Sequence, residues 1–270
     1  MNDRKLSRLN TFTCFIDLKK AFDNVNRDCL WYKLMKYGIN GKILNAVKSL
    51  YNNTACCVRL NNKLTSMIPV YSGVKQGCLI SPTLFAIYIN DLATDIKALN
   101  KGINIDGTNI SILLYADDIV LLATSENDLQ SMLNCVNNWC FKWRLSINCD
   151  KSNIVHFRSN SIERSSFQFN CGDYVITYTD SYKYLGLWFD EHLSWDKAIR
   201  ELSKSASRAL GCLTTKFYVC GGMNYHVFTK LYESLVQPIL HYGASIWGTT
   251  EHRLINNVQN RAAKIFLGVS

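Results

Sequence analysis

The sequence predicts an α+β fold, with an antiparallel sheet backed by helices and then a mostly helical region. Short strands mix with helices at uneven spacing up to about residue 190, which favours this arrangement over a regular βαβ winding. From about Ser194 the chain turns helical to its end. This change of character is the only candidate boundary, so we expect one domain over 1–190 and a helical one over 191–270.

Composition indicates a globular protein with a basic surface. The chain has 270 residues, is 48% hydrophobic and has only 3 prolines, so a sizeable core and little disorder are expected. The net charge of +9 favours a polyanionic partner, most simply nucleic acid, over an uncommitted basic surface. No run reaches the ~18 apolar residues that a membrane span needs, and the start leads into no signal segment.

The 11 cysteines include no C-x-x-C pair, and many lie in apolar runs, which is typical of small core residues rather than disulfides or zinc ligands. We therefore expect a soluble protein in a reducing, intracellular compartment.

The first third of the chain predicts a strand, a broken helix and a hairpin. Residues 11–18 are short, β-branched and aromatic, as in a strand. A helical pattern over 27–51 is interrupted near Gly38 and Gly41. Residues 54–72 form two extended runs around Asn61-Asn62, which predicts a β-hairpin with a tight turn.

The middle of the chain continues this pattern. Ser81-Pro82 supplies an N-cap and a first-turn proline, so a helix should run from Pro82 to Leu99. The remaining elements are a hairpin over 109–123, a helix over 126–142 and mostly strand over 153–158 and 174–189.

Paired carboxylates mark the candidate site. Asp117 and Asp118 lie between the apolar runs 112–114 and 119–122, and such close like charges repel unless a cation lies between them. A third carboxylate, Asp17, ends the first predicted strand. Three acidic groups at the ends of neighbouring strands are what a two-metal phosphoryl-transfer site needs.

The segment 196–216 predicts an amphipathic helix. Its apolar stripe holds Ile199, Leu202, Ala206, Ala209 and Leu213. The opposite side carries Lys197, Arg200, Lys204 and Arg208. This basic face is either an ordinary solvated surface or one that follows the phosphates of a nucleic acid.

Ordered motifs resemble the reverse transcriptase of non-LTR (LINE-type) retrotransposons. They cover about residues 11–190, and the tail extends the likeness. The motifs are FIDLKKAFD at 15–23, GVKQGCLISP at 73–82 with Asn90-Asp91-Leu92, YADD at 115–118, LSIN at 145–148 with Lys151, YLG at 184–186, and QPILHYG at 237–243 with Trp247. A lone Asp-Asp is a weak signal, whereas five blocks in the right order are a strong one.

The resemblance implies a polymerase palm followed by a helical thumb. It implies that Asp17, Asp117 and Asp118 hold two Mg²⁺ ions, with Mn²⁺ as a substitute, and that the Leu18 carbonyl is a further ligand. The other implied roles are deoxynucleotide selection by Phe22, template and nucleotide contacts by Gln76, Gly77 and Tyr115, pyrophosphate protonation by Lys151, and a primer grip at Tyr184, Leu185 and Gly186.

Several of these assignments have simpler alternatives. Phe22 and Tyr184 could be core residues, Gln76 and Gly77 could form only the loop before a helix, and Lys151 could be an ordinary turn lysine.

The resemblance departs from the family at the start, where the fingers are largely missing because only about ten residues precede the first motif. Arg4, Lys5 and Arg8 cannot replace that subdomain.

The leading hypothesis is an RNA-directed DNA polymerase domain whose partners are an RNA template, a DNA primer and deoxynucleoside triphosphates. A truncated, non-catalytic nucleic-acid-binding remnant is the alternative, and an intron-encoded or retron-type enzyme is a third reading. The location would be nuclear, cytoplasmic or both, and the oligomeric state stays open.

Overall fold

Two compact units make up the chain, and the division falls between Thr179 and Asp180. The computed structural model describes residues 2–269. The sequence placed a boundary near residue 190, about ten residues later, because the last two strands of the chain continue the strand-rich pattern of the first unit. In the structure, that hairpin belongs to the second unit.

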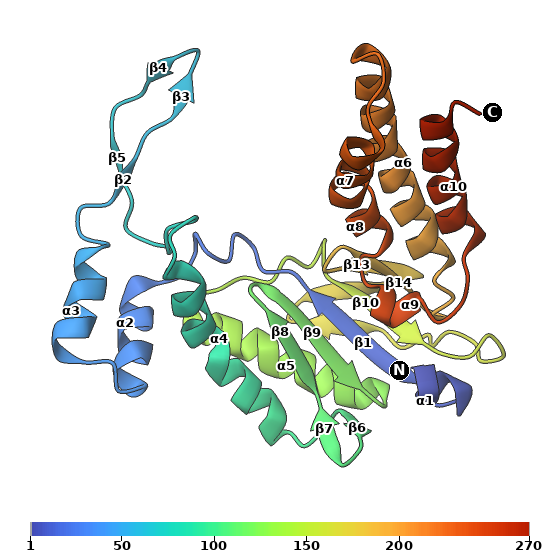
Figure 1. Ribbon diagram of the computed structural model, residues 1–270. Coiled ribbons are helices and arrows are strands. Elements are labelled where there is room, and N and C mark those ends of the chain that lie inside the picture. Colours follow the sequence, from blue (N-terminus) through green and yellow to red (C-terminus); the bar gives the residue numbers. More distant parts are fainter. Residues whose placement is uncertain (1, 270) are drawn as a thin grey trace. The chain divides into compact units, whose positions relative to one another are not determined.

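A six-stranded sheet forms the centre of the first unit (Figure 1). Its order is β11 (Phe169–Cys171), β12 (Tyr174–Tyr178), β10 (Asn153–Phe157), β1 (Thr11–Ile16), β9 (Asp118–Ala123) and β8 (Ile112–Tyr115). All neighbouring strands are antiparallel except β10 and β12, which are parallel. The predicted antiparallel sheet is therefore confirmed, with one parallel pair.

Helices α4 (Ser81–Ala98) and α5 (Glu126–Trp143) cover one face of this sheet (Figure 1). Phe12, Cys14 and Ile16 of β1 alternate toward the helices and join one core with them. The predicted helices are confirmed, but Ser81 is not the N-cap. It is the first residue of α4, follows Ile80, and is buried.

Two helices and a slender β-ribbon lie between β1 and α4 in sequence. Helices α2 (Arg27–Lys36) and α3 (Gly41–Ser49) replace the single interrupted helix of the prediction. The ribbon pairs β2 (Ala55–Cys56) with β5 (Ile68–Pro69) and β3 (Arg59–Leu60) with β4 (Lys63–Leu64). Asn61 and Asn62 both have positive φ, as in a type I′ turn, so the predicted hairpin and its turn are confirmed.

A buried lysine joins α2 to α4 and α5. The Lys33 ammonium makes a 2.7 Å ion pair with Asp91, and it lies 3.7 Å from the ring centroid of Trp143 and 4.5 Å from that of Trp139. It also donates to the Tyr88 carbonyl. Burial lowers the pKa of Lys33 to about 8, although Asp91 opposes this shift. The aromatic rings and the carboxylate compensate the buried charge.

The second unit consists of a hairpin and a helical bundle. Strands β13 (Ser181–Tyr184) and β14 (Leu187–Asp190) precede helices α6 (Asp196–Val219), α7 (Tyr225–Leu235), α8 (Gln237–Leu240), α9 (Ala244–Trp247) and α10 (Arg253–Leu267). Along α6, the predicted apolar stripe is buried at Ile199, Leu202, Ala206 and Leu213.

The smaller elements are α1 (Asn2–Leu6) and the pair β6 (Ile103–Ile105) and β7 (Thr108–Ile110). None of the helices within residues 2–269 is long and apolar enough to cross a membrane.

Candidate active site

The pairing of β1 with β9 brings two of the predicted carboxylates to one end of the sheet. Ile16 pairs with Ile119, so one further step along both strands sets Asp17 beside Asp118. The β8–β9 hairpin turns at Ala116-Asp117, between the paired residues Tyr115 and Asp118. Ala116 has a φ of +52° and Asp117 does not share the positive φ, which is the pattern of a type II′ turn.

Asp118 experiences the charges of the other two carboxylates. Burial raises the pKa of the Asp118 carboxyl, and the charges of Asp117 and Asp17 raise it further. This is the like-charge repulsion that a bound cation would relieve. Within residues 2–269, however, no three His, Cys, Asp or Glu side chains are gathered into one metal-ligating group.

A tight turn after α5 holds Asp17 through its backbone and its side chain. Asn148 donates from Nδ2 to Asp17 Oδ2 at 2.8 Å and from its backbone N–H to the Asp17 carbonyl at 2.8 Å. The Asp17 N–H donates to Ser152 Oγ at 3.1 Å, and this hydroxyl donates to the Asn148 carbonyl. Asp17 therefore has little freedom, although it lies beyond the end of β1.

The same turn carries Lys151 and faces Leu18. Leu18 forms an isolated antiparallel bridge with Ile147, whose hydrogen bonds use the Lys19 N–H and the Asp17 carbonyl. Lys151 is exposed, and its backbone N–H donates to the Asn148 carbonyl. Asn148 thus connects the candidate metal carboxylate to the candidate proton donor.

Phe22 packs against helix α4. Its ring stacks on Phe85 with centroids 4.7 Å apart and planes inclined by 14°, and the side chain is partly buried. The Phe22 carbonyl accepts a hydrogen bond from the Val74 N–H, which ties the segment after β1 to the loop before α4. The structure thus gives the ring a packing contact, and its role in sugar selection stays a prediction.

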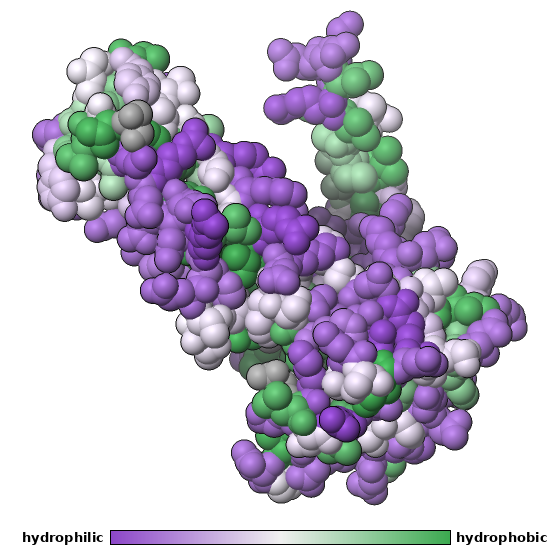
Figure 2. All heavy atoms as spheres, turned by 90° about the vertical axis from the view of Figure 1, so that its right-hand side faces the viewer, coloured by the Kyte–Doolittle hydropathy of each residue, from purple (hydrophilic) through white to green (hydrophobic). Residues whose placement is uncertain are grey.

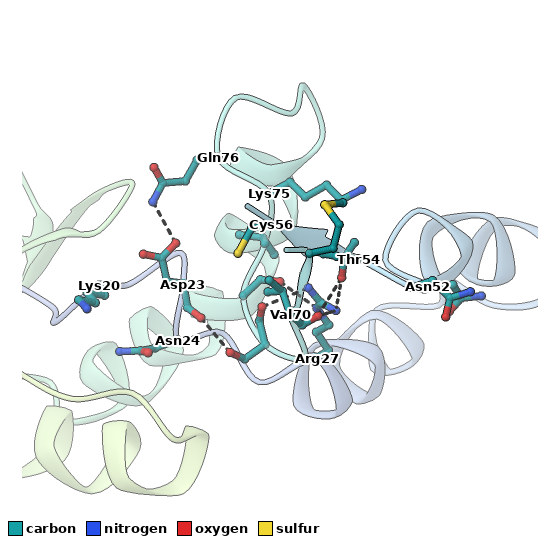
Figure 3. Close-up of a pocket in the computed structure, with 16 residues that line it drawn as sticks. Lys20, Asp23, Asn24, Arg27, Asn52, Thr54, Cys56, Val70, Lys75 and Gln76 are labelled. Carbon is teal, nitrogen blue, oxygen red and sulfur yellow. Dashed lines mark hydrogen bonds between the residues drawn. The ribbon is translucent and has the colours of Figure 1, made fainter. Parts of the chain in front are cut away.

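Gln76 and Asp23 meet beside a large cleft (Figure 3). Gln76 Nε2 donates to Asp23 Oδ1 at 3.0 Å. Arg27 fixes the cleft wall by donating to the carbonyls of Val70, Ser72 and Gly73. The loop that carries Gln76 is therefore built on the segment that follows Asp17.

Gly73 and Gly77, both in the loop before α4, have different surroundings. A Cβ on Gly73 would lie 2.7 Å from the Asp23 carbonyl oxygen, and its φ is +81°. A Cβ on Gly77 would meet no protein atom within 4 Å, although φ is +80° there. Gly77 thus keeps open space above the loop, while Gly73 lets the loop pack on Asp23.

The candidate primer-grip hairpin is held by a residue from the tail motif. Leu185 and Gly186 both have positive φ in the turn between β13 and β14. The Tyr242 hydroxyl donates to the Leu185 carbonyl, and a Cβ on Gly186 would lie 3.3 Å from the Tyr242 ring. Trp247 in turn donates to the Tyr242 carbonyl at 2.9 Å.

The four basic residues predicted on α6 do not form one uniform row. Lys197 Nζ donates to Ser181 Oγ and lies 3.6 Å from the Trp188 ring centroid. The others line a groove of about 520 Å³ between α6 and α10, together with Arg261 of α10. These three are Arg200, Lys204 and Arg208. Lys204 also makes a 2.8 Å ion pair with Glu201.

Comparison with known proteins decides the family. A family model described as "Reverse transcriptase (RNA-dependent DNA polymerase)" matches residues 2–189. The chain belongs to the reverse transcriptase family. The family resemblance seen in the motifs is therefore confirmed.

The related proteins are polymerases of non-LTR retrotransposons. This reverse transcriptase chain is 27% identical over 266 residues to the "RNA-directed DNA polymerase from mobile element jockey" of Drosophila funebris, covering 96% of the chain and 28% of that relative. It is 24% identical to the Pol polyprotein of the type-1 retrotransposable element R2 of Popillia japonica, covering 83% of the chain and 38% of that relative. The chain thus spans between a quarter and two fifths of these relatives.

A solved structure has the same fold. Telomerase from Candida tropicalis, in complex with a fragment of telomeric RNA, aligns with a TM-score of 0.52 and 13% identity, over 97% of this chain and 40% of that one. At this identity the likeness concerns the fold alone, and it agrees with a palm-containing polymerase fold.

Motif reading missed the residues that position this reverse transcriptase's candidate groups. Asn148, Ser152, Asp23 and Tyr242 contact candidate residues across the fold, and Arg261 lines the groove beside α6. Asp23, Asn148 and Tyr242 lie inside recognised motifs, which was the available signal. Arg261 and Ser152 had no sequence signal, because only the folded chain brings them to their partners.

Proposed function

We propose that the chain carries out RNA-directed DNA synthesis, adding deoxynucleotides to a primer 3′-OH on an RNA template. The observation that carries this proposal is the convergence of Asp17 with the Asp117-Asp118 turn at one end of the sheet. Membership of the reverse transcriptase family and the polymerase relatives support it.

The carboxylate set has the chemistry for divalent metal ions. Asp17, Asp117 and Asp118 are hard oxygen donors, which Mg²⁺ prefers, and a bound cation would relieve the repulsion at Asp118. Two bound Mg²⁺ ions, or Mn²⁺ in their place, would lower the pKa of the primer 3′-OH and offset the charge of the triphosphate. The Leu18 carbonyl would be a further ligand. The chain's own part is to hold these oxygens in place, which Asn148 does for Asp17.

The remaining candidate residues would orient the substrates. Phe22 would lie against the sugar and exclude a 2′-OH, while Gln76, Gly77 and Tyr115 would contact the nucleotide and the template. Lys151 would donate a proton to the leaving pyrophosphate. Its exposure and its link to Asp17 through Asn148 support this role.

The second unit would hold the nucleic acid. The hairpin at Tyr184, Leu185 and Gly186 would support the primer end. Arg200, Lys204 and Arg208 would contact backbone phosphates along α6, and Arg261 widens this basic groove. We assign Lys197 a weaker share, because its ammonium already bonds Ser181 and lies over Trp188. We also propose a reducing nuclear or cytoplasmic location.

Primer extension tests the function directly. The chain is given a poly(rA) template with an oligo(dT) primer, labelled dTTP and Mg²⁺. Asp117→Asn should abolish incorporation because it removes a carboxylate charge from the site. Asp173→Asn, an equal change at an exposed turn of the same unit, should leave incorporation intact.

Two results would contradict the proposal. Equal incorporation by Asp117→Asn and the unmutated chain would separate synthesis from these carboxylates. No incorporation by the unmutated chain would favour the nucleic-acid-binding remnant, which the family match and the intact carboxylates do not favour.

A further inference from the structure

The positive charge of the chain is concentrated in one stretch. Residues 29–90 contain seven lysines and arginines and neither aspartate nor glutamate. These seven residues account for seven of the nine net positive charges of the chain. The stretch includes most of α2, all of α3, the ribbon and the loop before α4. A polyanion would meet no carboxylate there to repel it.

The basic side chains of this stretch are mostly free to meet a partner. Lys33 is the exception, because it is buried beside Asp91. Lys36, Lys42, Arg59 and Lys63 are exposed, and within residues 2–269 none of these four makes an ion pair with a carboxylate. Their charges are therefore available over the surface of α2, α3 and the ribbon.

The ribbon, which we call the arm (residues 55–69), also exposes an unusual amount of apolar surface. Leu60 is 69% exposed, Leu64 60%, Met67 66%, and Tyr71 at its base 83%. Figure 2 shows hydrophobic side chains along the length of the slender arm and hydrophilic ones at its tip. From Ala55 to its turn at Asn61 the arm reaches roughly 20 Å at strand geometry. A free two-stranded ribbon is marginally stable in water, so such a surface indicates a partner.

A polar cleft lies at the base of the arm. It has a volume of about 1030 Å³, and Lys20, Arg27 and Lys75 bring positive charge to it. Figure 3 shows that Asn24, Asn52 and Gln76 also surround this space. Asp23 is the one acidic lining residue, and one of its oxygens already accepts from Gln76. Amide side chains of this kind hydrogen-bond the edges of unpaired bases.

We propose that the arm and the cleft at its base form a binding surface for single-stranded RNA. Arg59 and Lys63 contact phosphates, the apolar side chains and Tyr71 pack against unpaired bases, and the amides of the cleft meet base edges. A duplex hides its bases, so it could use the charges but not the apolar surface. If the proposed function holds, this RNA is the strand to be copied, because the cleft adjoins the segment that follows Asp17.

Binding of a short oligo(rU) to the full chain, without nucleotides, tests the charged part. The variant Arg59→Gln/Lys63→Gln is compared with Lys97→Gln/Lys230→Gln, which removes two exposed charges outside the stretch. Each lost phosphate contact on a single strand lowers the salt slope by about 0.7, so the arm variant should lose about 1.4. Its affinity should fall on the order of ten-fold at low salt, whereas the control keeps both slope and affinity.

The apolar part has its own variant. Leu60→Ser/Tyr71→Ala keeps every charge, so it should keep the salt slope and still lose roughly five-fold or more in affinity for oligo(rU). Binding of duplex DNA to this variant should not change.

Thiol footprinting locates the RNA on the unmutated chain. Cys56 and Cys57 are exposed on the arm, while Cys212 on α6 and Cys220 just after it are also exposed and serve as an internal comparison. Bound oligo(rU) should slow maleimide modification of Cys56 and Cys57, as read by mass spectrometry of their peptides.

Three results would overturn the proposal: unchanged RNA affinity in both arm variants, protection confined to Cys212 and Cys220, or a loss confined to duplex DNA. Protection of the arm thiols that follows protein concentration rather than RNA would assign the arm to a second copy of the chain. These binding assays contain no nucleotide, so Asp117→Asn should bind RNA normally. A failure of the chain to polymerise DNA would therefore not change the outcome of the binding assays.

Discussion

Asn148 donates a 2.8 Å hydrogen bond to one carboxylate oxygen of Asp17, and its backbone N–H bonds the carbonyl of the same residue. Asp17 lies just beyond the end of β1, where strand pairing no longer fixes its side chain. A single residue of the turn after α5 therefore orients the first carboxylate of the site. The oxygen that Asn148 leaves unbonded is then available to a ligand.

Asn148→Ala should weaken metal binding without unfolding the chain. Loss of a group that orients a metal ligand typically lowers metal affinity or activity about 10- to 100-fold, and we expect a loss of metal affinity in this range here. Binding of Mn²⁺ followed by electron paramagnetic resonance measures this loss independently of synthesis. In primer extension, the Mg²⁺ concentration needed for half-maximal rate should rise by a similar factor.

A matched variant separates positioning from general damage. Asn138→Ala removes an exposed asparagine of α5 and should leave Mn²⁺ affinity unchanged. Asn148→Asp keeps the shape but places a negative charge against Asp17, so it should bind Mn²⁺ differently from Asn148→Ala. Equal affinities in all variants would show that Asn148 only supports the turn.

Asp118→Asn should raise stability at neutral pH in the absence of divalent cations. Burial and the charges of Asp117 and Asp17 raise the pKa of Asp118, so the folded state disfavours its ionised form. The free-energy cost of the ionised Asp118 carboxylate is fully present above its raised pKa. This cost disappears as the pH falls through that pKa toward the ordinary pKa of an aspartate. The site is partly solvated, so we expect a gain of at most about 1 kcal/mol.

Thermal unfolding across pH checks this expectation. The Tm of Asp118→Asn should exceed that of the unmutated chain near pH 7, and the difference should shrink as the pH falls through the raised pKa of Asp118. Millimolar Mg²⁺ should raise the Tm of the unmutated chain more than that of the variant. A difference that does not depend on pH would remove like-charge repulsion as its cause.

Phe22→Val should relax sugar selection at the site. The smaller side chain no longer fills the space that a 2′-OH would need, and differences of this size typically change discrimination about 10- to 200-fold. The ratio of kcat/KM for dTTP to that for UTP measures the effect. Because Phe22 stacks on Phe85, some loss of stability is also expected.

The simpler role of Phe22 predicts another result. If the ring only completes the core, Phe22→Val lowers the Tm and leaves the dTTP-to-UTP ratio unchanged. Phe85→Leu, which removes the stacking partner, then supplies the comparison, since it should cost similar stability and change the ratio less.

Sequence patterns predicted the elements better than the contacts between them. The β1 strand, the Asn61-Asn62 turn and the paired aspartates all depend on local residue order, and the structure has them where expected. Ser81 was misplaced because cap rules describe isolated helix ends, whereas this serine is buried at the start of α4.

Contacts between distant segments were the least visible from sequence. Asn148 reaches Asp17 across 131 positions, and Tyr242 reaches Leu185 across 57. No local periodicity of the sequence encodes contacts between residues so far apart in the chain. The acid-free stretch 29–90 was readable from composition by segment, but the total charge of the chain concealed it.

Tyr242→Phe should weaken the candidate primer-grip hairpin. The phenol loses its bond to the Leu185 carbonyl, which is worth about 1 kcal/mol, while the ring still covers Gly186. We expect the KM for primer–template to rise several-fold and kcat to change less. Tyr218→Phe, at a tyrosine 65% exposed on α6, is the matched control. A change confined to kcat would contradict a role in holding the primer.

Lys33 should make the stability of the first unit rise with pH. Its pKa is about 8 when folded, against an ordinary value of 10.5. Between these values the unfolded chain binds more protons than the folded one, so raising the pH favours folding at this site. Relative to Lys33→Met, the unmutated chain should gain about 1.4 kcal/mol between pH 7 and 9.

Urea unfolding of both chains at each pH gives this difference directly, and other titrating groups cancel because both chains share them. Lys36→Met, on the exposed side of the same helix, should show no pH-dependent difference. If Lys33→Met and Lys36→Met behave alike, the buried ammonium is fully compensated by Asp91 and the aromatic rings. A difference that falls with pH would mean that the charged form of Lys33 is favoured in the folded state, contrary to its burial.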